Sequence, residues 1–504
     1  MTSTAGTTRP TGRRRVVSAA AAGALAVSGV VLVATPAEAG PSTRGCENRV
    51  NASIDKLLTC VTAAGVTEHL AAFQAAADAN GGNRASGSTG YAASADHVDA
   101  TLTAAGYDVV RQSFEFPFFE QTSAAGFAQV APEAATYAEG TDFAVATFSG
   151  SGDVTAVAQA VDTDFTPTAT STSGCEAADF AGFTAGSIAL VQRGSCDFAV
   201  KSANAEAAGA AGVVIVNRGT SDDGGLISPT LGAPGVGIPV VGTTSALGST
   251  LAGDTLALTV DAVSEVRTTE NLTAELPGRV DDGVVVVGGH LDSVPEGPGI
   301  NDNGSGSATI LEVAQNLART QLEHPVRFAF WGAEEFGLLG SQAYVDSLTD
   351  AELARIGSYL NFDMLGSPNH ANFVYDSDAS TFPAPEGYVS AESGAIEATF
   401  EAFYDSRGIA YEDTEFDGRS DYQAFADAGI PSGGLFSGAE DVKTPEQAAR
   451  YGGTAGVAYD ACYHQACDDL DNVSQLALDQ NSDAVAYAVL TIADAGTGPG
   501  QGNG

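Results

Sequence analysis

The sequence predicts an α/β fold in which a mainly parallel, mixed sheet carries helices on both faces. Buried-strand patterns alternate with helical stretches in the second half of the chain; the strand patterns are GVVVVGGHLD at 283–292, VRFAFWGAEE at 326–335, SYLNFDMLG at 358–366 and PSGGLFSG at 431–438. Such alternation is typical of parallel strands joined by helices. An α/β pattern also occupies residues 66–121, so we expect one domain to be built from 66–121 and 264–494.

The middle of the chain, residues 122–263, has a different character. It is rich in alanine, glycine, valine and threonine and contains many short apolar runs. Residues 186–217 have the pattern of strand, loop, helix and strand. We find no cluster of histidine, aspartate and glutamate in this segment that would hold a metal. The sequence therefore predicts a small β-rich domain inserted into the first one.

Residues 1–39 have the pattern of a secretory signal peptide. The basic stretch RPTGRRRVV precedes the apolar run AAAAGALAVSGVVLVA, and AEA then ends at Ala39 with small residues at the spacing of a cleavage site. The apolar run is nearly long enough for a membrane anchor, but its small-residue exit favours cleavage. We expect a secreted protein without a further membrane span. The glycine-rich residues 495–504 are expected to form a disordered tail.

The net charge restricts the partners of the protein. The formal charge is −42, and the predicted signal carries four arginines and one glutamate, so the remaining chain is near −45. Phosphates would repel such a chain, which argues against nucleic acid as a partner. The simplest explanation is a solvated acidic surface that keeps an exported protein soluble, and calcium binding is the lesser alternative.

The six cysteines fall into three close couples. They are Cys46 with Cys60, Cys175 with Cys196, and Cys462 with Cys467. An even number of cysteines in an exported chain predicts disulfides, and proximity alone favours these local pairs among the many connectivities that six cysteines allow. Zinc binding by cysteine is the alternative, but no C-x-x-C motif occurs. The first pair would staple residues 40–65 as a short lead-in.

Imidazole and carboxylate groups gather where the predicted strands end. In chain order they are His290, Asp292, Asp302, Glu334, Glu335, Asp363 and His464. Ligands bind at the carboxyl ends of the strands in sheets of this kind, so we expect these side chains to meet. Each group also has a plainer explanation: Asp302 could be only a helix N-cap, His464 a surface residue in a disulfide loop, and the paired glutamates solvated.

Taken together, these groups predict a metal centre. Two adjacent glutamates directly after the apolar strand RFAFWGA would place like charges near a buried edge, which is costly unless a cation compensates. Oxygen and imidazole ligands without cysteine suit catalytic zinc. Two zinc ions can share one carboxylate and activate a bridging water, with a further acid left as the general base. Asp292 is placed to receive the second ring nitrogen of His290. No G-x-S-x-G motif occurs, which argues against a serine hydrolase of the α/β type.

Five ordered motifs resemble those of peptidase family M28, the co-catalytic zinc aminopeptidases, and of its secreted actinomycete leucine-type members in particular. They are GGHLDSVPEGPGINDNGSGSA, WGAEEFGLLGS, NFDMLGSP, DGRSDYQAFADAGIPSGGLFSGAE and CYHQACDDLDN. The resemblance covers roughly residues 66–116 and 269–494. The middle segment resembles a protease-associated (PA) domain through RGSCDFAVKSANAEAAGAAGVVIVN and the upstream Cys175.

The resemblance implies two zinc ions per chain. One ion would be held by His290 and Asp363 and the other by Glu335 and His464, with Asp302 bridging the two. Glu334 would be the general base that takes a proton from a water bridging the metals and passes it to the leaving amine.

The resemblance also implies roles around the substrate. Tyr463 matches a tyrosine that stabilises the tetrahedral intermediate, although packing beside the disulfide would also explain it. Arg419 and Phe436 match residues of the substrate pocket, and Phe436 could equally be core. Asp413 falls where the family has an acid near the substrate's amino group.

A calcium site is a further feature of some relatives. They hold the ion with two acids on a late helix and a third acid near the N-terminus of the domain. Asp479 and Asp483 match the late pair, but Cys60 and Val61 stand at the position of the third acid. This departure counts against calcium in the present chain.

The leading prediction is a secreted, monomeric zinc aminopeptidase that removes N-terminal residues, large and apolar in the leucine-type manner, from peptides with a free N-terminus. A carboxypeptidase or a glutaminyl cyclase on the same scaffold is the alternative enzyme, because Arg419 could meet a C-terminal carboxylate. A binding protein with a dead peptidase domain would lack ligands, whereas every ligand position is filled here. The PA segment could be a lid over the substrate, an interaction module or a structural insert.

Overall fold

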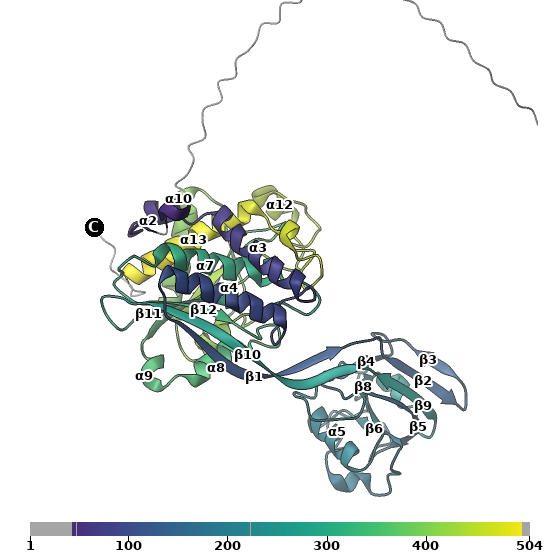
Figure 1. The fold of residues 1–504 in the computed structure, drawn as a ribbon. Helices are drawn as coiled ribbons and strands as arrows, with labels where there is room; N and C mark the ends of the chain where they lie inside the picture. The colour runs from purple at the N-terminus through teal and green to yellow at the C-terminus, as the bar shows by residue number, and fades with distance from the viewer. Residues whose placement is uncertain (1–42, 47, 222, 496–504) are drawn as a thin grey trace, which may run out of the picture. The chain divides into compact units, whose positions relative to one another are not determined.

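A computed structural model describes residues 43–46, 48–221 and 223–495 (Figure 1). The predicted signal peptide, residues 1–39, and positions 496–504 of the predicted tail lie outside these described residues. Within the described part of the chain, no helix is both long enough and apolar enough to cross a membrane.

The first of two sheets is mixed and has eight strands. Its order is β1 (Val109–Gln121), β10 (Ala262–Leu276), β12 (Val326–Trp331), β11 (Val284–His290), β13 (Ile356–Phe362), β16 (Ser432–Phe436), β14 (Phe373–Tyr375) and β15 (Glu412–Thr414). The four central strands, from β12 to β16, run parallel, and antiparallel pairs flank them. This arrangement confirms the predicted α/β fold with a mainly parallel core.

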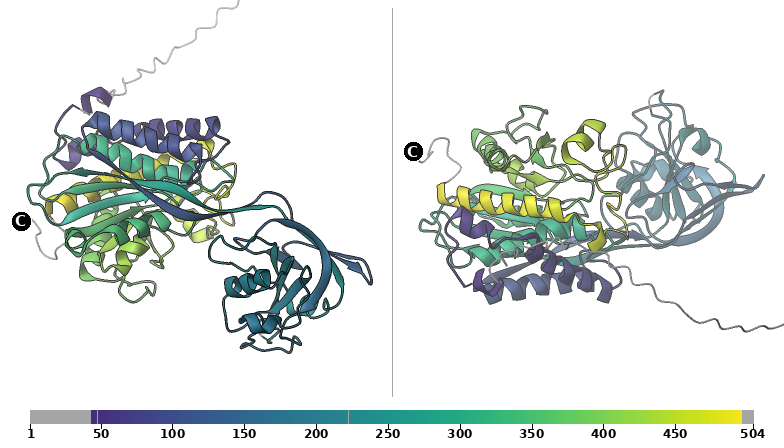
Figure 2. Two further views of the ribbon diagram at one scale, coloured as in Figure 1. Left: turned by 60° about the horizontal axis from the view of Figure 1, so that its bottom comes forward. Right: turned by 90° about the horizontal axis from the view of Figure 1, so that it is seen from above.

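Helices cover both faces of this sheet (Figures 1 and 2). One face packs against α3 (Ala63–Ala79), α4 (Thr89–Ala105), α7 (Gly306–Leu317), α10 (Ala391–Arg407) and α13 (Gln475–Ala495). The other packs against α8 (Leu339–Ser347), α9 (Asp350–Leu353) and α11 (Tyr422–Asp427). Strand β11 shows why the valine run is unbroken: Val285 and Val287 enter the first core, and Val284 and Val286 enter the second.

The second sheet lies within the predicted insertion. Its order is β3 (Ala135–Tyr137), β2 (Gly126–Ala131), β9 (Thr255–Val260), β5 (Gly152–Ala160), β6 (Ile188–Gln192), β7 (Gly212–Val216), β8 (Val240–Thr243) and β4 (Phe143–Val145). Helix α5 (Phe198–Ala207) joins β6 to the parallel strand β7, as the strand, loop, helix and strand pattern predicts. A short helix, α6 (Ser245–Gly248), and the 3₁₀ turn Ala177–Phe180 complete this part, which has its own apolar clusters.

Strands β1 and β10 lead into and out of the second sheet. They pair antiparallel along their common length, from Val109 opposite Ala274 to Gln121 opposite Ala262. The domain of the first sheet has one segment before the insertion and one after it, and the pairing of β1 with β10 joins these two segments in a continuous ladder. The remaining short elements are α1 (Thr43–Cys46), α2 (Ile54–Leu58), α12 (Pro445–Tyr451) and the 3₁₀ turn Leu470–Asn472.

The structure joins the six cysteines in the three local couples. The disulfides are Cys46–Cys60, Cys175–Cys196 and Cys462–Cys467. The first fastens the residues ahead of α3, the second lies within the inserted segment, and the third closes a short loop that contains His464.

The interior of the first sheet should respond strongly to the loss of side-chain volume. Leu360 lies on β13 and is fully buried, so Leu360→Ala should lower the free energy of unfolding by about 2–5 kcal/mol. The single tryptophan, Trp331 on β12, makes urea unfolding followed by fluorescence a probe of this domain. Leu476→Ala on the exposed face of α13 is the control and should cost less than about 0.5 kcal/mol. Equal losses in the two variants would contradict the assigned core.

Candidate metal centre and substrate cavity

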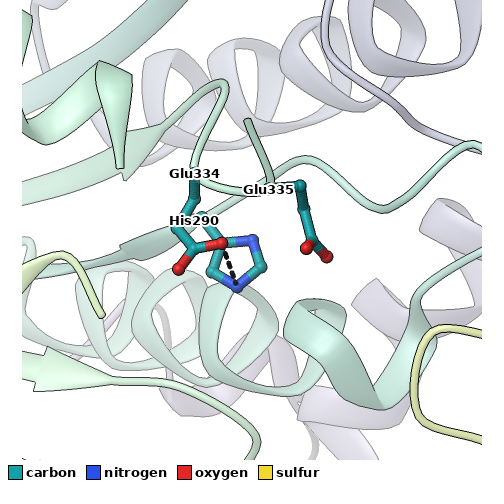
Figure 3. Close-up of side chains that lie close together, drawn as sticks. All are labelled: His290, Glu334 and Glu335. Atoms are coloured by element: carbon teal, nitrogen blue, oxygen red, sulfur yellow. Dashed lines mark ion pairs between the residues drawn. The ribbon is translucent and has the colours of Figure 1, made fainter. Parts of the chain in front are cut away.

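Three neighbouring parallel strands bring the first site residues together. His290 is the last residue of β11, Asp363 follows β13 directly, and Glu334 and Glu335 lie just beyond β12. Because β12, β11 and β13 are adjacent and parallel, their carboxyl ends meet at one edge. Figure 3 shows His290, Glu334 and Glu335 converging there, with Glu334 Oε2 at 3.9 Å from His290 Nε2.

Asp302 stands at the centre of the site and faces two histidines. It lies in an irregular turn, Ile300–Ser305, ahead of α7. Its Oδ1 is 3.3 Å from His290 Nε2, and its Oδ2 is 3.2 Å from His464 Nε2. Each oxygen of one carboxylate is thus directed to a different imidazole, which is the arrangement that a bridging ligand requires.

The neighbouring residue, Asn303, performs the capping that Asp302 could have performed. Asn303 Oδ1 accepts hydrogen bonds from the backbone N–H of Gly306, at 2.9 Å, and of Met364, at 3.1 Å. The first of these satisfies a free N–H at the start of α7. Asp302 makes no such bond, so the N-cap explanation for Asp302 does not hold.

Among the described residues, two of the five groups of side chains with the spacing of metal ligands share Asp302. They are His290, Asp302 and Asp363, and Asp302, Glu335 and His464. His290 Nε2 lies 3.3 Å from Asp363 Oδ1, and His464 Nε2 lies 3.1 Å from Glu335 Oε2. Tetrahedral zinc with bonds of about 2.0–2.1 Å separates its ligands by about 3.3 Å. Glu335 Oε1 is buried without a hydrogen-bond partner, as expected of an atom that awaits a cation. The residues therefore fit zinc.

The charges of the site are buried and strongly perturbed. Burial and, to a lesser extent, the neighbouring Asp302 together raise the pKa of Glu335 to about 8. Burial, together with Glu335 and Asp363, holds the pKa of Glu334 well above its ordinary value. Burial lowers the pKa of His464, but hydrogen bonds to Asp302 and Glu335 outweigh it and raise this pKa to about 10. Without a metal, the site therefore holds protons where a cation would otherwise balance the charge.

The ring of His290 is oriented from behind by Asp292. The closest contact of His290 Nδ1 is the backbone carbonyl of Asp292, at 3.1 Å, whereas the carboxylate oxygen Oδ1 lies at 3.7 Å. That Oδ1 accepts a hydrogen bond from the backbone N–H of Glu334, at 3.3 Å. Asp292 is thus the expected residue, but it reaches the imidazole through its main chain and uses its carboxylate to fix the start of the Glu334–Glu335 turn.

Sequence reasoning missed Arg84. This arginine is fully buried, and its guanidinium donates to the carbonyls of Leu291, Pro298 and Gly299. Burial lowers the pKa of Arg84 to about 10, although nearby carboxylates, Asp292 first among them, oppose the shift. No ion pair recorded for the described residues includes it. Only the rarity of buried arginine marks it, and burial is invisible in the sequence.

Asp468 was also missed, and it holds the turn that carries Asp302. Its two oxygens accept hydrogen bonds from the backbone N–H groups of Asn301, at 2.8 Å, and Asp302, at 3.0 Å. Burial raises the pKa of Asp468 to about 7. Its position one residue after Cys467 places it at the end of the disulfide loop, and nothing in the local sequence distinguishes it from the neighbouring aspartates.

A cavity of about 540 Å³ opens onto the site, and the predicted substrate residues line it. Tyr463 stacks on His464 with 3.8 Å between ring centroids. Phe436, at the end of β16, faces Phe373 and is half-buried, so it belongs to both the core and the cavity wall. Asp413, on β15, accepts a hydrogen bond from the hydroxyl of Thr381.

The cavity is strongly acidic apart from its histidines and one arginine. Five further carboxylates line it, namely those of Glu412, Glu415, Asp417, Glu440 and Asp441. Arg419 is largely exposed and pairs with Glu440, with 3.3 Å between Nη2 and Oε1. A cationic group of a substrate would therefore be attracted to this cavity, and an anionic group would be repelled.

The two acids considered for calcium do not form a ligand cluster. Asp479 is exposed and Asp483 is partly buried on α13. Among the described residues, the groups of three or more potential ligands within reach of one ion include neither of them.

Comparison with known proteins agrees with this geometry. Residues 271–489 match the model of peptidase family M28, and residues 154–251 match that of the PA domain. An aminopeptidase of Pseudomonas aeruginosa is 47% identical over 486 residues, which cover 93% of this chain and 90% of the relative. The chain belongs to peptidase family M28. It carries a PA domain and is a metallo-exopeptidase of the aminopeptidase type.

Other relatives of this M28 peptidase support the same assignment. Leucine aminopeptidase 2 of Trichophyton rubrum is 46% identical over 329 residues, 64% of this chain and 65% of the relative. The solved aminopeptidase from Aneurinibacillus sp. strain AM-1 is 26% identical, with a TM-score of 0.62, and the match covers 88% of this chain and 96% of that one. BSAP, a zinc aminopeptidase from Bacillus subtilis, is 25% identical with a TM-score of 0.55, covering 86% and 96%. Zinc is thus the metal that the family implies.

Loss of Arg84 should destabilise the peptidase. Arg84→Met removes three buried hydrogen bonds to carbonyls, each worth about 1 kcal/mol or more, so unfolding in urea should become easier by at least about 3 kcal/mol. Arg279→Met, at an exposed arginine paired with Glu323, should change stability by less than about 0.5 kcal/mol. A stability of Arg84→Met equal to that of the control would show that water replaces the guanidinium.

Zinc binding should become tighter with rising pH well beyond the range of an ordinary histidine. His464 carries a proton in the metal-free protein up to a pKa of about 10, and a zinc ion that bound this imidazole would have to displace that proton. Between pH 7.5 and 9 the affinity should rise by at least about tenfold per pH unit, measured by competition with a chelator, because the raised pKa of Glu335, about 8, adds to the dependence at the lower end of this range. His464→Gln should make the slope shallower without abolishing it, since the pKa of His290 is also raised. An affinity of the wild type that levels off above pH 7.5 would contradict the raised pKa.

Proposed function

We propose that this M28 peptidase binds two zinc ions and hydrolyses the N-terminal residue, large and apolar, from peptides with a free amine. The observation that carries the proposal is the central carboxylate: Asp302 belongs to both ligand groups and turns one oxygen to each. His290 and Asp363 would hold one ion, and Glu335 and His464 the other. When bound, such a pair of ions lowers the pKa of water and polarises a carbonyl group.

Glu334 is the general base in this proposal. It lies beside His290 at the edge of the site, and although it is close to His290 and Glu335, it belongs to neither of the two groups that share Asp302. Its side chain is only 11% exposed and lies next to the ligand groups, where it can take a proton from the attacking water. The same carboxyl group then returns the proton to the nitrogen of the leaving amine. Tyr463, which lines the cavity, would donate a hydrogen bond from its hydroxyl to the oxyanion of the tetrahedral intermediate.

The cavity supports recognition of a free N-terminus. Its carboxylates, Asp413 among them, would pair with the α-ammonium group, and a blocked N-terminus would lose that interaction. Aromatic side chains, including Phe373 and Phe436, offer an apolar surface to the first side chain. The leucine aminopeptidases among the relatives support this preference.

The alternative enzymes fit the cavity less well. A carboxypeptidase needs a free cation for the C-terminal carboxylate, whereas Arg419 is already paired with Glu440. A dead binding protein would lack ligands, and here all five predicted ligand positions and the base converge. A glutaminyl cyclase would show no release of an N-terminal residue, so the assay below distinguishes it.

We further propose that the enzyme is a secreted monomer. The signal-like residues 1–39 and the three disulfides support export. The peptidase domain would consist of residues 66–121 and 264–494, with the PA domain at 122–263. The pairing of β1 with β10 supports this division, because one strand comes from each segment.

The base and the exopeptidase specificity are tested together by one assay. With zinc present, the protein should release leucine from a leucine-initiated peptide and not from its N-acetylated form. Glu334→Gln should lower kcat by about 10²–10⁴-fold while both zinc ions remain bound, since it removes the proton acceptor and leaves the five ligands. Glu446→Gln, on the exposed helix α12 outside the cavity, is the matched control and should keep the wild-type rate.

Two results would oppose the proposal. Equal hydrolysis of the free and acetylated peptides, or release from the other end, would indicate a different exopeptidase. A rate for Glu334→Gln close to that of the wild type would remove Glu334 from the role of base.

A further inference from the structure

A chain of buried hydrogen bonds runs from the interior of the first sheet to Asp363. The indole Nε1–H of Trp331 donates to the hydroxyl of Tyr359 at 2.9 Å, and this hydroxyl donates to Asn361 Oδ1 at 3.0 Å. Asn361 Nδ2 donates to the hydroxyl of Ser420 at 2.9 Å, and that hydroxyl donates to Asp363 Oδ2 at 2.7 Å. The hydrogen bonds of these four side chains thus form one line that ends on Asp363, a proposed zinc ligand.

The direction of the chain is fixed by its two ends. Trp331 can only donate, and the ionised carboxylate of Asp363 can only accept. If the amide of Asn361 were turned round, the hydroxyl of Tyr359 would receive two donors and its own proton would have no acceptor. The single proton of Ser420 would then be shared between two acceptors. Only the order described above satisfies every group, and burial makes an unsatisfied group costly.

The surrounding structure is built around this chain. Trp331, Tyr359 and Asn361 are fully buried and Ser420 is nearly so. Trp331 ends β12 and Tyr359 lies on β13, so their hydrogen bond crosses over β11, which lies between them. The crossing passes Gly288, where a Cβ atom would lie 2.7 Å from both bonded atoms. The glycine in the VVVVGGH strand therefore leaves room for the chain.

The chain determines which oxygen of Asp363 is free. Oδ2 is taken by Ser420, while Oδ1 faces His290 Nε2 at 3.3 Å. The ring of Tyr359 is itself held by stacking on Phe425, with centroids 3.9 Å apart and planes 3° from parallel. A carboxylate that is restrained through one oxygen cannot rotate to offer both oxygens to an ion.

We propose that Trp331, Tyr359, Asn361 and Ser420 act as one positioning chain for Asp363, so that this residue presents a single oxygen, Oδ1, to the metal beside His290. Trp331, Tyr359 and Asn361 lie outside the lining of the cavity, whereas Ser420 is part of its wall, and all four act on the metal only through Asp363. The inference rests on the proposed role of Asp363 as a zinc ligand. Because tuning of a ligand by its hydrogen-bond partners commonly changes metal affinity by about 10–100-fold, the effect is measurable without any peptide substrate.

The test measures zinc binding to the metal-stripped full-length protein by competition with a chelator that resolves the two sites. Ser420→Ala should weaken one of the two sites by about 10–100-fold and leave the other unchanged. Tyr359→Phe, which keeps the stacked ring and removes only the hydroxyl, should weaken the same site by a smaller factor. The double variant should bind zinc no more weakly than Ser420→Ala alone, because residues of one chain are not additive.

The matched control is Tyr404→Phe. Tyr404 is a fully buried tyrosine on the other face of the sheet, and its hydroxyl donates to Asn481. Asn481 in turn donates to the backbone carbonyl of Leu365, so this path reaches the main chain after Asp363 and no side-chain atom of Asp363. Urea unfolding of the metal-free variants checks that each is folded. The control should retain the affinity of both zinc sites.

The outcomes separate this inference from the proposed function. If the wild type takes up no zinc, the proposed function fails and the inference fails with it. If the wild type binds two zinc ions and both Ser420→Ala and Tyr359→Phe bind them equally well, only the positioning chain is overturned. Additive losses in the double variant, or an equal loss in Tyr404→Phe, would also overturn it.

Discussion

The metal centre of this peptidase depends on keeping several carboxylates close together where little water reaches them. Asp302 is the group on which the others converge, since its two oxygens lie 3.3 Å and 3.2 Å from the imidazoles of His290 and His464. Like charges buried at such distances repel one another unless protons or cations compensate. The raised pKa values of Glu335 and His464 mean that protons can provide this compensation. The zinc that the family implies would provide it instead when bound. The position of Asp302 therefore sets the geometry of the whole centre.

The sheet and the loops solve different parts of this problem. His290, Glu335 and Asp363 follow adjacent parallel strands, so regular pairing is enough to bring them to one edge. Asp302 and His464 come from irregular segments, which need other restraints. Arg84 gathers the carbonyls of the segment that precedes Asp302, Asp468 holds its backbone N–H, and the Cys462–Cys467 disulfide closes the loop of His464. Burying an arginine and an aspartate costs free energy because both lose their contact with water. Their hydrogen bonds to the backbone are needed to offset that cost.

The polar interior of the sheet has a related purpose. A parallel sheet covered on both faces is normally apolar, yet Trp331, Tyr359 and Asn361 place a line of polar groups inside it. These groups satisfy one another in a fixed direction that ends on Asp363. Trp331 and Tyr359 belong to the apolar cluster on one face of the sheet, which excludes water, so the line stays ordered. The hydrogen bonds thus connect the core of the sheet to the carboxyl ends of its strands, where Asp363 lies.

The sequence by itself determined the fold class, the presence of an inserted β-rich segment and the residues at the strand ends, because strand periodicity and strand-end position are local properties of the chain. That the insertion is a PA domain followed from the resemblance of its motif to that family. The sequence left open whether Asp302 was a cap or a ligand, because both roles place an aspartate before a helix. The tertiary structure excludes the cap by giving that role to Asn303, and it directs the two oxygens of Asp302 to different histidines, which supports the proposed ligand role. Arg84, Asp468 and the chain from Trp331 to Ser420 could not be predicted. Their partners lie up to hundreds of residues away in the sequence, and burial, which gives those hydrogen bonds their importance, arises only when the sheet and its helices have packed.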